Sequence, residues 1–293
     1  MRVLFDADSM VYGCGFASQK VVYDYVLVSD DEVIEGIALS RDELAATAAM
    51  LPEGWTISYN SIAEAEPLEN ALALCKRQIL RVEEDLTRLG YDFQRLELFL
   101  TGKGNFRDAL AVTKPYKGNR LAMEKPIHYK AIRRYLRNRW GAVVVDGREA
   151  DDEVAIISAS LNYDPEQVVI VSQDKDLLTV PGLLYNYRKR EMRYVTPKEA
   201  LVSFYRQMLT GDAVDNIGGC YRVGETKAKT LIHEGLTEYE MYKTVLEQFE
   251  KSKKTKGCPY ADRDAAEVVL EHGRLLHMLR SPEDVWIPPA KNS

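Results

Sequence analysis

The sequence predicts an α/β fold with a mostly parallel central sheet flanked by helices, followed by a helical unit. Short apolar runs alternate with amphipathic segments up to about residue 195, and this alternation is typical of a sheet buried on both faces. After Thr196 the periodicity is helical only. The 293 residues, 46% hydrophobic and 29% charged, suffice for one large folded domain with a smaller appendage.

The first half of the chain predicts four strands and one long helix. Short apolar or β-branched runs indicate strands over Arg2–Asp8, Val21–Val28, Val33–Leu39 and Leu96–Leu100. The middle two strands flank the turn-forming residues 29–32 and should form a hairpin. From Pro67 to Leu89 apolar residues recur near the 3.6-residue period, and Gly90 follows as a stop signal, which predicts a helix.

The second half continues the alternation. Apolar runs predict strands over Ala142–Val145, Val168–Val171 and Leu183–Asn186, and amphipathic segments predict helices over Ile127–Arg139 and Glu149–Leu161. We therefore expect a core over residues 1–195, and a helical unit with a C-terminal tail over residues 196–293.

Composition argues against several classes of protein. No apolar run approaches the ~20 residues that span a bilayer, so no membrane partner is expected. The chain begins with a strand-like segment and shows no secretory leader, so the cytoplasm (of the host cell, for a viral protein) is the expected compartment. The four cysteines form no CxxC, which indicates a reducing compartment and no structural zinc: Cys14, Cys75, Cys220 and Cys258.

The distribution of charge indicates two different sites. The net charge of −6 argues against a generic nucleic-acid binder. Between Lys103 and Arg139, however, there are eleven Lys or Arg residues and only two acids, Asp108 and Glu124. An acidic protein with one strongly basic stretch predicts one site for phosphates and another for cations.

Acidic residues follow several of the predicted strands. The C-terminal ends of parallel strands meet at one edge of a sheet, so acids distant in sequence should converge there. The candidates are Asp6, Glu149, Asp151, Asp152, Asp174 and Asp176, with Asp212 and Asp215 from the helical part. So many carboxylates repel one another unless cations lie between them, and hard oxygen ligands suit Mg²⁺ or Mn²⁺. Two such ions would account for the number of acids.

Each cluster also has a structural interpretation when taken alone. Acids in the first turn of a helix interact favourably with its dipole, which explains residues 149–152 without any metal. The segment around Asp174 is a common polar loop, Asp6 can cap a strand end, and Asp212 and Asp215 can belong to turns. Only the conjunction of all these clusters favours a metal site.

The basic stretch provides candidate phosphate ligands. Lys103, Arg107, Lys114, Lys117 and Arg120 place cations beside glycines and Tyr116, which could stack on a base. For the helix predicted over residues 127–139, which carries Lys130 and Arg134, a solvated basic face is an equally good interpretation. Lys117 and Arg120 follow a predicted strand and should lie near the acidic edge, where a Lys can stabilise a transition state.

Taken together, these residues resemble the 5′-nuclease superfamily of flap endonucleases and 5′–3′ exonucleases, especially its bacteriophage and bacterial members. Residues 116–120 resemble its PEYKGNR-type motif, and residues 147–152 its GxEADD motif. Residues 172–178 are similar to its STDxDxxQL-type segment, and residues 211–217 match GDxxDNI. The motifs occur in the family's order and cover roughly residues 96–235.

The resemblance implies a PIN-like fold and a two-metal site. Asp6, Glu149, Asp151 and Asp152 would surround one metal, and Asp174, Asp176, Asp212 and Asp215 the other. Lys117 and Arg120 would contact the scissile phosphate, with Tyr116 placing the terminal nucleotide. A helical arch would lie within residues 103–140, between about Leu121 and Trp140. Residues 211–232 would form a helix-three-turn-helix motif that grips duplex DNA and holds K⁺, using Gly218, Gly219, Gly224, Lys227 and Lys229.

Three features depart from the family pattern. The acid that usually ends the strand before the arch is missing, because Leu100 stands at its position. Asp8 can replace it only if the backbone from Asp6 to Asp8 stays extended. Residues 220–222 interrupt the duplex-gripping turn, and Gln19–Glu66 is longer than the family needs, which suggests an added ribbon or partner surface.

We therefore expect a metal-dependent 5′ nuclease that acts on DNA 5′ ends, flaps or nicks, and on RNA–DNA primers, as a monomer alongside replication proteins. One alternative is a catalytically weak DNA-binding relative that has lost a metal ligand at Leu100. The other is a small PIN-like ribonuclease, a class that lacks the duplex-gripping unit expected after Gly211. The number of acids that remain favours an active enzyme over the weak relative.

Overall fold

A computed structural model describes residues 1–120 and 124–291. The chain forms two compact units. The sheet unit comprises Met1–Ser9, Arg81–Glu124 and Leu136–Ser293, and the ribbon unit comprises Met10–Leu80 and Lys125–Tyr135. A search of the described residues finds no helix with the length and apolar character that a bilayer crossing requires.

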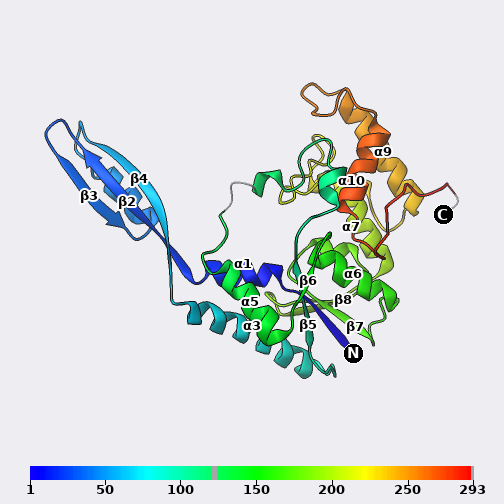
Figure 1. Ribbon diagram of the computed structural model, residues 1–293. Coiled ribbons are helices and arrows are strands. Elements are labelled where there is room, and N and C mark those ends of the chain that lie inside the picture. Colours follow the sequence, from blue (N-terminus) through cyan, green and yellow to red (C-terminus); the bar gives the residue numbers. More distant parts are fainter. Residues whose placement is uncertain (121–123, 292–293) are drawn as a thin grey trace. The chain divides into compact units, whose positions relative to one another are not determined.

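The sheet unit is built on six strands in the order β6-β5-β1-β7-β8-β9 (Figure 1). Their bounds are β1 Arg2–Asp6, β5 Leu96–Thr101, β6 Val143–Val145, β7 Val168–Val171, β8 Gly182–Asn186 and β9 Glu191–Val195. All neighbouring pairs are parallel except β8 and β9. The structure thus confirms the mostly parallel α/β sheet. The antiparallel edge strand β9 was not predicted, because its alternating polar residues resemble a loop.

The central strands are apolar because both faces of the sheet are covered. All four residues of β7 are buried, as are Val3, Leu4 and Phe5 of β1. Helix α6 (Ala150–Ser160) packs on one face, where Val154 joins Leu4 and Ile170 in one core cluster. Full burial of such a side chain contributes about 1.5–3 kcal/mol, which fixes the strand ends that carry the candidate acids.

The chain after Thr196 is helical, as predicted, apart from an isolated bridge between Asp212 and Ile217. The helices are α7 Pro197–Thr210, α8 Glu225–Leu231, α9 Glu238–Lys253 and α10 Ala265–Leu276. Thr196 and Glu199 form a capping box at the start of α7. These helices share one compact unit with the sheet. Compactness therefore does not divide the chain at residue 195, and that boundary stays a prediction.

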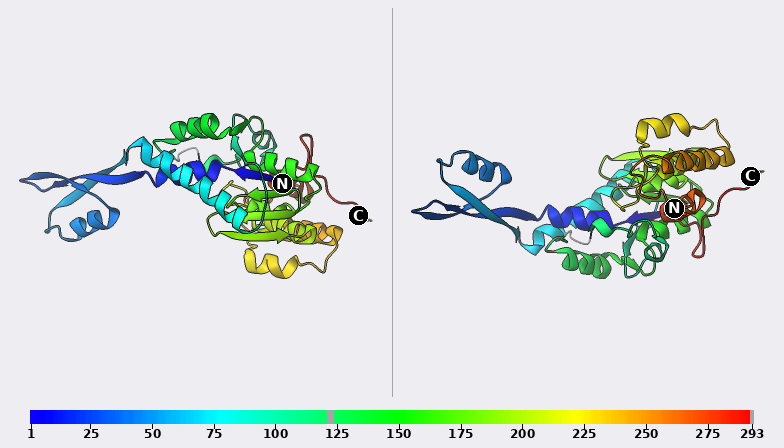
Figure 2. Two further views of the ribbon diagram at one scale, coloured as in Figure 1. Left: turned by 90° about the horizontal axis from the view of Figure 1, so that it is seen from below. Right: turned by 90° about the horizontal axis from the view of Figure 1, so that it is seen from above.

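The ribbon unit contains a three-stranded antiparallel sheet in the order β3-β2-β4 (Figure 2). Its elements are α1 Asp8–Phe16, β2 Gln19–Val28, β3 Val33–Ala38, α2 Arg41–Ala49 and β4 Thr56–Ala65. The predicted hairpin is confirmed. Helix α2 and strand β4 were missed, because α2 buries a single side chain, Leu44, and β4 is largely exposed and interrupted by polar residues.

Two helices run through the boundary between the units and match the predictions closely. They are α3 (Leu68–Arg88) and α5 (Tyr129–Trp140). The expected arch also includes residues 121–123, which lie outside the described residues. One prediction was wrong: the first strand ends at Asp6, and Asp8 already begins helix α1. The remaining short helices are α4 Arg107–Leu110, η1 Gly118–Arg120 and η2 Asp176–Thr179.

Candidate metal and phosphate site

Asp6 lies at the C-terminal end of the central strand β1. Its side chain is buried, and its Oδ2 accepts a hydrogen bond of 3.0 Å from the Ser172 hydroxyl directly after β7. Burial, together with the nearby charges of Asp8 and Asp174, raises the pKa of Asp6 to about 7. The acids that follow β1 and β7 therefore interact with one another, as the parallel topology predicts.

The loop after β7 presents Asp174 and Asp176 on the same edge. The Ser172 hydroxyl accepts the backbone N–H of Asp174 at 3.0 Å, and Asp174 Oδ1 accepts that of Asp176 at 2.9 Å. Burial and the nearby charges of Asp174 and Asp212 raise the pKa of Asp176 to about 7. This tight turn brings the carboxylates of Asp174 and Asp176 to the same end of the sheet.

Helix α6 contributes the acids of its first turn. Glu149 is its N-cap residue, and Asp152 accepts the Glu149 backbone N–H in a capping box. Burial raises the pKa of Asp151 well above its ordinary value, and the charges of Glu149 and Asp152 raise it further. The charge of Asp6 acts in the same direction, so Asp151 lies near the acids of β1.

Asp152 and Arg107 form a fully buried ion pair, with exposed fractions of 0% and 2%. The guanidinium donates to both carboxylate oxygens, at 2.5 and 2.8 Å, and also to the carbonyl oxygens of Leu275 and His277. In this structure Arg107 and Asp152 pair with each other and join α6 to the end of α10. That Asp152 ligates a metal and that Arg107 contacts nucleic acid stay predictions.

Tyr116, Lys117 and Arg120 lie against the carboxylates of Glu149 and Asp215. The Tyr116 hydroxyl is 2.5 Å from Glu149 and 2.8 Å from Asp215, and it can donate to one of them at a time. Lys117 Nζ donates to Glu149, and Arg120 donates to Asp215 at 2.7 Å. Burial opposes ionisation of both Lys117 and Glu149, but their pairing outweighs it. The pKa of Lys117 is therefore raised and the pKa of Glu149 is lowered.

Asp212 belongs to the turn after α7 and is also paired with a cation. Its Oδ2 is 2.9 Å from Lys175 Nζ, and its Oδ1 accepts the backbone N–H groups of Val214 and Asp215. Burial alone would raise its pKa, but Lys175 and these hydrogen bonds lower it. Gln207 on α7 donates to both Asp176, at 2.6 Å, and Asp212, at 3.3 Å. Asp212 and Asp176 are thus neighbours.

The eight candidate acids divide into two groups. Glu149, Asp152, Asp212 and Asp215 each pair with a Lys or Arg. Among the described residues, no Lys or Arg lies within ion-pair distance of Asp6, Asp151, Asp174 or Asp176. This grouping differs from the two ligand sets that the family pattern implies.

The uncompensated group fits a divalent cation chemically. Its donors are hard carboxylate oxygens, and the raised pKa values of three of its members reflect burial and mutual repulsion, which a cation would relieve. Within residues 1–120 and 124–291, no three His, Cys, Asp or Glu side chains already lie close enough together to hold an ion. Ligation would therefore require side-chain rotation.

Asp8 lies beside the end of β5, the strand that lacks the acid of the family pattern. Leu100 is fully buried in β5, and the next residue, Thr101, donates its backbone N–H to Asp8 Oδ2 at 2.9 Å. Asp8 begins a helix, so the extended backbone on which the replacement of the missing acid was made to depend is not present, and that replacement stays a prediction. The Asp8 carboxylate reaches the end of β5 from the first turn of α1.

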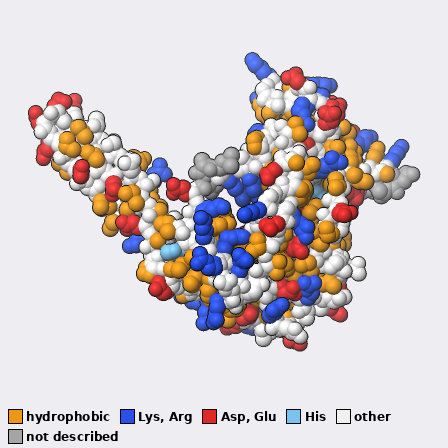
Figure 3. Space-filling model, viewed as in Figure 1, with side chains coloured by type: hydrophobic (Ala, Val, Ile, Leu, Met, Phe, Trp, Pro, Cys, Tyr) orange, Lys and Arg blue, Asp and Glu red, His pale blue; other side chains and the backbone are white. Residues whose placement is uncertain are grey.

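The remaining predicted nucleic-acid ligands are exposed. Lys103, Lys114, Lys130 and Arg134 are all exposed, the last two on α5. Lys and Arg side chains gather in one region of the face that Figure 3 shows. In the expected duplex-gripping segment, Gly218 and Gly224 are exposed, with Gly224 as the N-cap of α8, and Lys227 and Lys229 are exposed on α8. Gly219 is buried with φ 62°, and an added Cβ would lie 2.3 Å from Gly211 N.

Sequence reasoning missed four residues that position this site. Ser172, Gln207 and Lys175 hold the acids directly, as described above. The buried Glu271 on α10 accepts the backbone N–H groups of Val112 and Thr113 at 2.8 and 2.6 Å, just before the Tyr116 segment. Only Ser172 and Lys175 lie within a recognised motif, and nothing in the spacing of the other two indicates their partners.

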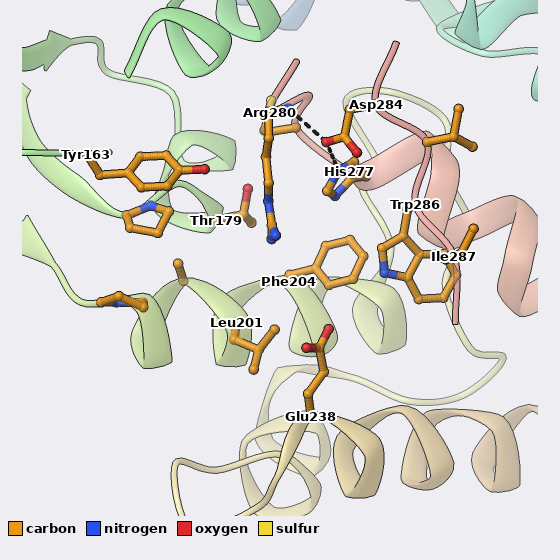
Figure 4. A pocket seen from close by; sticks show the side chains of 15 residues that line it. Tyr163, Thr179, Leu201, Phe204, Glu238, His277, Arg280, Asp284, Trp286 and Ile287 are labelled. Carbon is orange, nitrogen blue, oxygen red and sulfur yellow. Dashed lines mark hydrogen bonds and ion pairs between the residues drawn. The ribbon is translucent and has the colours of Figure 1, made fainter. Parts of the chain in front are cut away.

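A separate cavity of about 460 Å³ lies between α7, the start of α9 and the C-terminal tail. Arg280 extends into it between Tyr163 and Phe204, and Trp286 forms one wall (Figure 4). None of the candidate acids lines this cavity. It is distinct from the site at the strand ends.

Comparison with known proteins gives several relatives. No protein-family profile matches the chain. It is 26% identical over 189 residues to a 5′-3′ exonuclease of Buchnera aphidicola (subsp. Schizaphis graminum), covering 59% of this chain and 63% of that protein. It is 31% identical over 136 residues to a 5′-3′ exonuclease of Mycoplasmopsis pulmonis, covering 41% and 44%. The chain thus spans less than two thirds of the curated relatives it matches.

Two solved structures of bacteriophage T5 nucleases are also similar. A zinc-bound T5 5′-exonuclease has a TM-score of 0.47 at 17% identity, covering 69% of this chain and 80% of that one. A T5 flap endonuclease complexed with DNA and metal ions has a TM-score of 0.41 at 15% identity, covering 70% and 90%. The curated sequence relatives confirm the resemblance that the motifs indicate.

Proposed function

We propose that this chain, which its curated relatives ally with the 5′-nuclease superfamily, is a divalent-metal-dependent 5′ nuclease that hydrolyses phosphodiester bonds of DNA near a 5′ end. The observation that carries the proposal is the group of four carboxylates without cationic partners at the end of the parallel sheet. Next to it, Tyr116, Lys117 and Arg120 form a cluster with two positive charges. Metal-dependent phosphodiester hydrolysis needs carboxylates that hold the metal ions and positively charged side chains that bind the phosphate.

Asp6, Asp151, Asp174 and Asp176 would hold the metal ions, two Mg²⁺ or Mn²⁺, with Asp8 as an additional ligand at the end of β5. When bound, such ions supply an activated water and neutralise charge on the phosphate. Ser172 fixes the orientation of Asp6 through its hydroxyl. Glu149, Asp212 and Asp215 would support the site as hydrogen-bonded neighbours.

Lys117 and Arg120 would act on the scissile phosphate. In the structure both are paired with carboxylates, so phosphate binding would exchange these partners for phosphate oxygens. Lys117 is held charged by its neighbours, which suits it to stabilise negative charge in the transition state. Tyr116 is buried and anchored by its hydroxyl, so placing the terminal nucleotide would require its ring to become accessible.

The remaining parts would bind DNA outside the reacting centre. The exposed Lys and Arg side chains on α5 and α8 suit the phosphate backbone of DNA. The buried Gly219 allows the close turn after Gly211, where the family pattern implies K⁺. DNA with 5′ ends, flaps or nicks is the proposed substrate, with RNA–DNA primers as a second one. We also propose that the protein acts as a monomer in the cytoplasm, alongside replication proteins.

The experiment that tests the function uses three labelled substrates. A 5′-flap duplex, a nicked duplex and an RNA-primed duplex are incubated with the protein in Mg²⁺ or in EDTA, and the products are sized. We expect cleavage near the 5′ end in Mg²⁺ only, and the preferred substrate distinguishes exonuclease from flap endonuclease activity. Binding without cleavage in any metal would support the catalytically weak alternative.

The variant Asp174→Asn tests the metal site. It should reduce cleavage by about a hundredfold or more while DNA affinity changes little, because metal binding is weakened and the basic residues remain. Asp262→Asn, at an exposed position in the loop before α10, is the matched control and should cleave like wild type. Equal cleavage rates for Asp174→Asn and wild type would contradict the assignment.

A further inference from the structure

The sheet of the ribbon unit is covered by a helix on one face and is open on the other. Directly opposed residues in antiparallel strands share a face, so the register assigns each side chain to one of the two. Leu27 and Ala38 are buried and share one face, and α2, whose Leu44 is also buried, contacts both β2 and β3. Figure 2 shows α2 on one side of these strands only.

The opposite face combines exposed aliphatic residues with acids. We call it the open face and define it by Asp24, Val26, Val28, Val33, Glu35 and Ile37. Val28 opposes Val33, Val26 opposes Glu35, and Asp24 opposes Ile37. Val33 and Ile37 are exposed at 63% and 60% of their surface. β-Branched side chains this exposed on a sheet face favour a further packed layer.

The charge of the ribbon limits what that layer can be. Residues 19–66 contain ten acids and two bases, a net charge of −8, although the whole chain carries only −6. The turn between β2 and β3 adds Asp30, Asp31 and Glu32 at the end of the open face. A DNA backbone would be repelled by such a surface, whereas a partner rich in Lys and Arg would be attracted.

We propose that the open face docks a basic amphipathic helix of a protein partner. A helix on the second face would complete the layered packing that α2 begins on the first. Its aliphatic side chains would contact Val28, Val33 and Ile37, and its Lys or Arg side chains would pair with Asp24 and Glu35. This role is independent of the nuclease proposal, because residues 19–66 contribute none of the candidate acids.

The test uses the full chain and a defined probe. A fluorescent synthetic helical peptide of Leu and Lys is titrated by anisotropy, beside a counterpart with Glu in place of Lys. We expect the Lys peptide to bind about tenfold or more tightly than the Glu peptide. Ile37→Ser should weaken binding about fivefold or more, as should Asp24→Asn with Glu35→Gln. Val33→Thr, which keeps the side-chain shape, is a second variant should Ile37→Ser misfold.

Matched controls separate the open face from the rest of the ribbon. Ile34→Ser lies on the same strand but on the other face, and Asp42→Asn with Glu53→Gln removes the same charge elsewhere. Both should bind the Lys peptide like wild type. Equal binding of the two peptides, or equal loss in Ile34→Ser and Ile37→Ser, would overturn the proposal. The proposal would also be overturned if the protein formed a dimer, or bound DNA, and Ile37→Ser abolished that binding. Either result would assign the open face to another occupant.

Discussion

Arg107 and Asp152 show at the scale of single residues how burial decides the role of a charge. Asp152 lies in the GxEADD-like motif and Arg107 in the basic stretch, which suggest contact with metal and with DNA, yet each is enclosed and paired with the other. Burial opposes the charged form of Arg107, but Asp152 outweighs it and raises the pKa of Arg107. Removing one partner would leave the other charge buried and uncompensated.

Arg107→Met should therefore lower the free energy of unfolding by about 3–5 kcal/mol. The comparison is Arg148→Met, which breaks a partly exposed pair with Glu153 and should cost about 1 kcal/mol or less. Urea denaturation of the two variants and wild type measures the difference. Similar losses of unfolding free energy in both variants would show that the buried pair contributes no more to stability than the partly exposed pair.

Lys117 is the residue at which the proposed chemistry can be tested most directly. Lys117→Ala should slow single-turnover cleavage by about a hundredfold, because a charge that acts on the transition state is lost. Lys114→Ala removes an exposed charge three residues away and should mainly weaken DNA binding. Rapid-quench measurements at saturating protein separate the two effects. An unchanged single-turnover rate for Lys117→Ala would reject its role.

At the scale of elements, helix α10 holds the segment that carries Tyr116 and Lys117. The carboxylate of Glu271 accepts two backbone N–H groups of this segment and also contacts the Thr113 hydroxyl and Arg263. These hydrogen bonds and Arg263 outweigh burial and lower the pKa of Glu271. A helix near the C-terminal end of the chain thus sets the position of residues that lie next to the acids.

Glu271→Gln should loosen this segment, because it removes the charge and one acceptor oxygen. We expect a stability loss of about 1–3 kcal/mol and cleavage slowed by about tenfold at saturating DNA. Glu267→Gln, exposed on the same helix, should change neither quantity. Thermal unfolding and single-turnover rates together test this. A loss of stability with wild-type cleavage would limit Glu271 to a structural role.

At the scale of the whole molecule, the uncompensated acids link stability to pH and metal. Asp6 and Asp176 have pKa values raised to about 7 from 3.8. A folded state that holds these protons is favoured below the unfolded value, and this contribution is lost as pH rises towards about 7. The proposed metal binding would compete with the same protons, so it should strengthen over this range.

Without metal, the melting temperature of wild type should therefore fall between pH 5 and 7 relative to that of Asp6→Asn with Asp176→Asn. The stabilisation by Mg²⁺ should increase over the same interval in wild type and stay small in the variant. Calorimetry in EDTA and in Mg²⁺ at each pH measures both trends. Parallel curves for the two proteins in EDTA would contradict the linkage.

The sequence by itself determined the parallel sheet and most of its elements. Apolar runs such as Val168–Val171, alternating with amphipathic segments, are typical of a sheet buried on both faces, and the topology then brings Asp6 and Asp174 to one edge. The order of four motifs was enough to identify the relatives. These features are local or follow from general rules of packing, so periodicity and spacing encode them.

Only the tertiary structure decided which of the acids pair with a Lys or Arg side chain. Whether a carboxylate faces an arginine depends on contacts between residues far apart in sequence, such as Arg107 with Asp152 and Glu271 with Val112. The same holds for Asp8, which reaches the end of β5 from a helix, and for the open face, which depends on where α2 packs. Residue type and spacing specify charge, but burial and partners set how that charge is used.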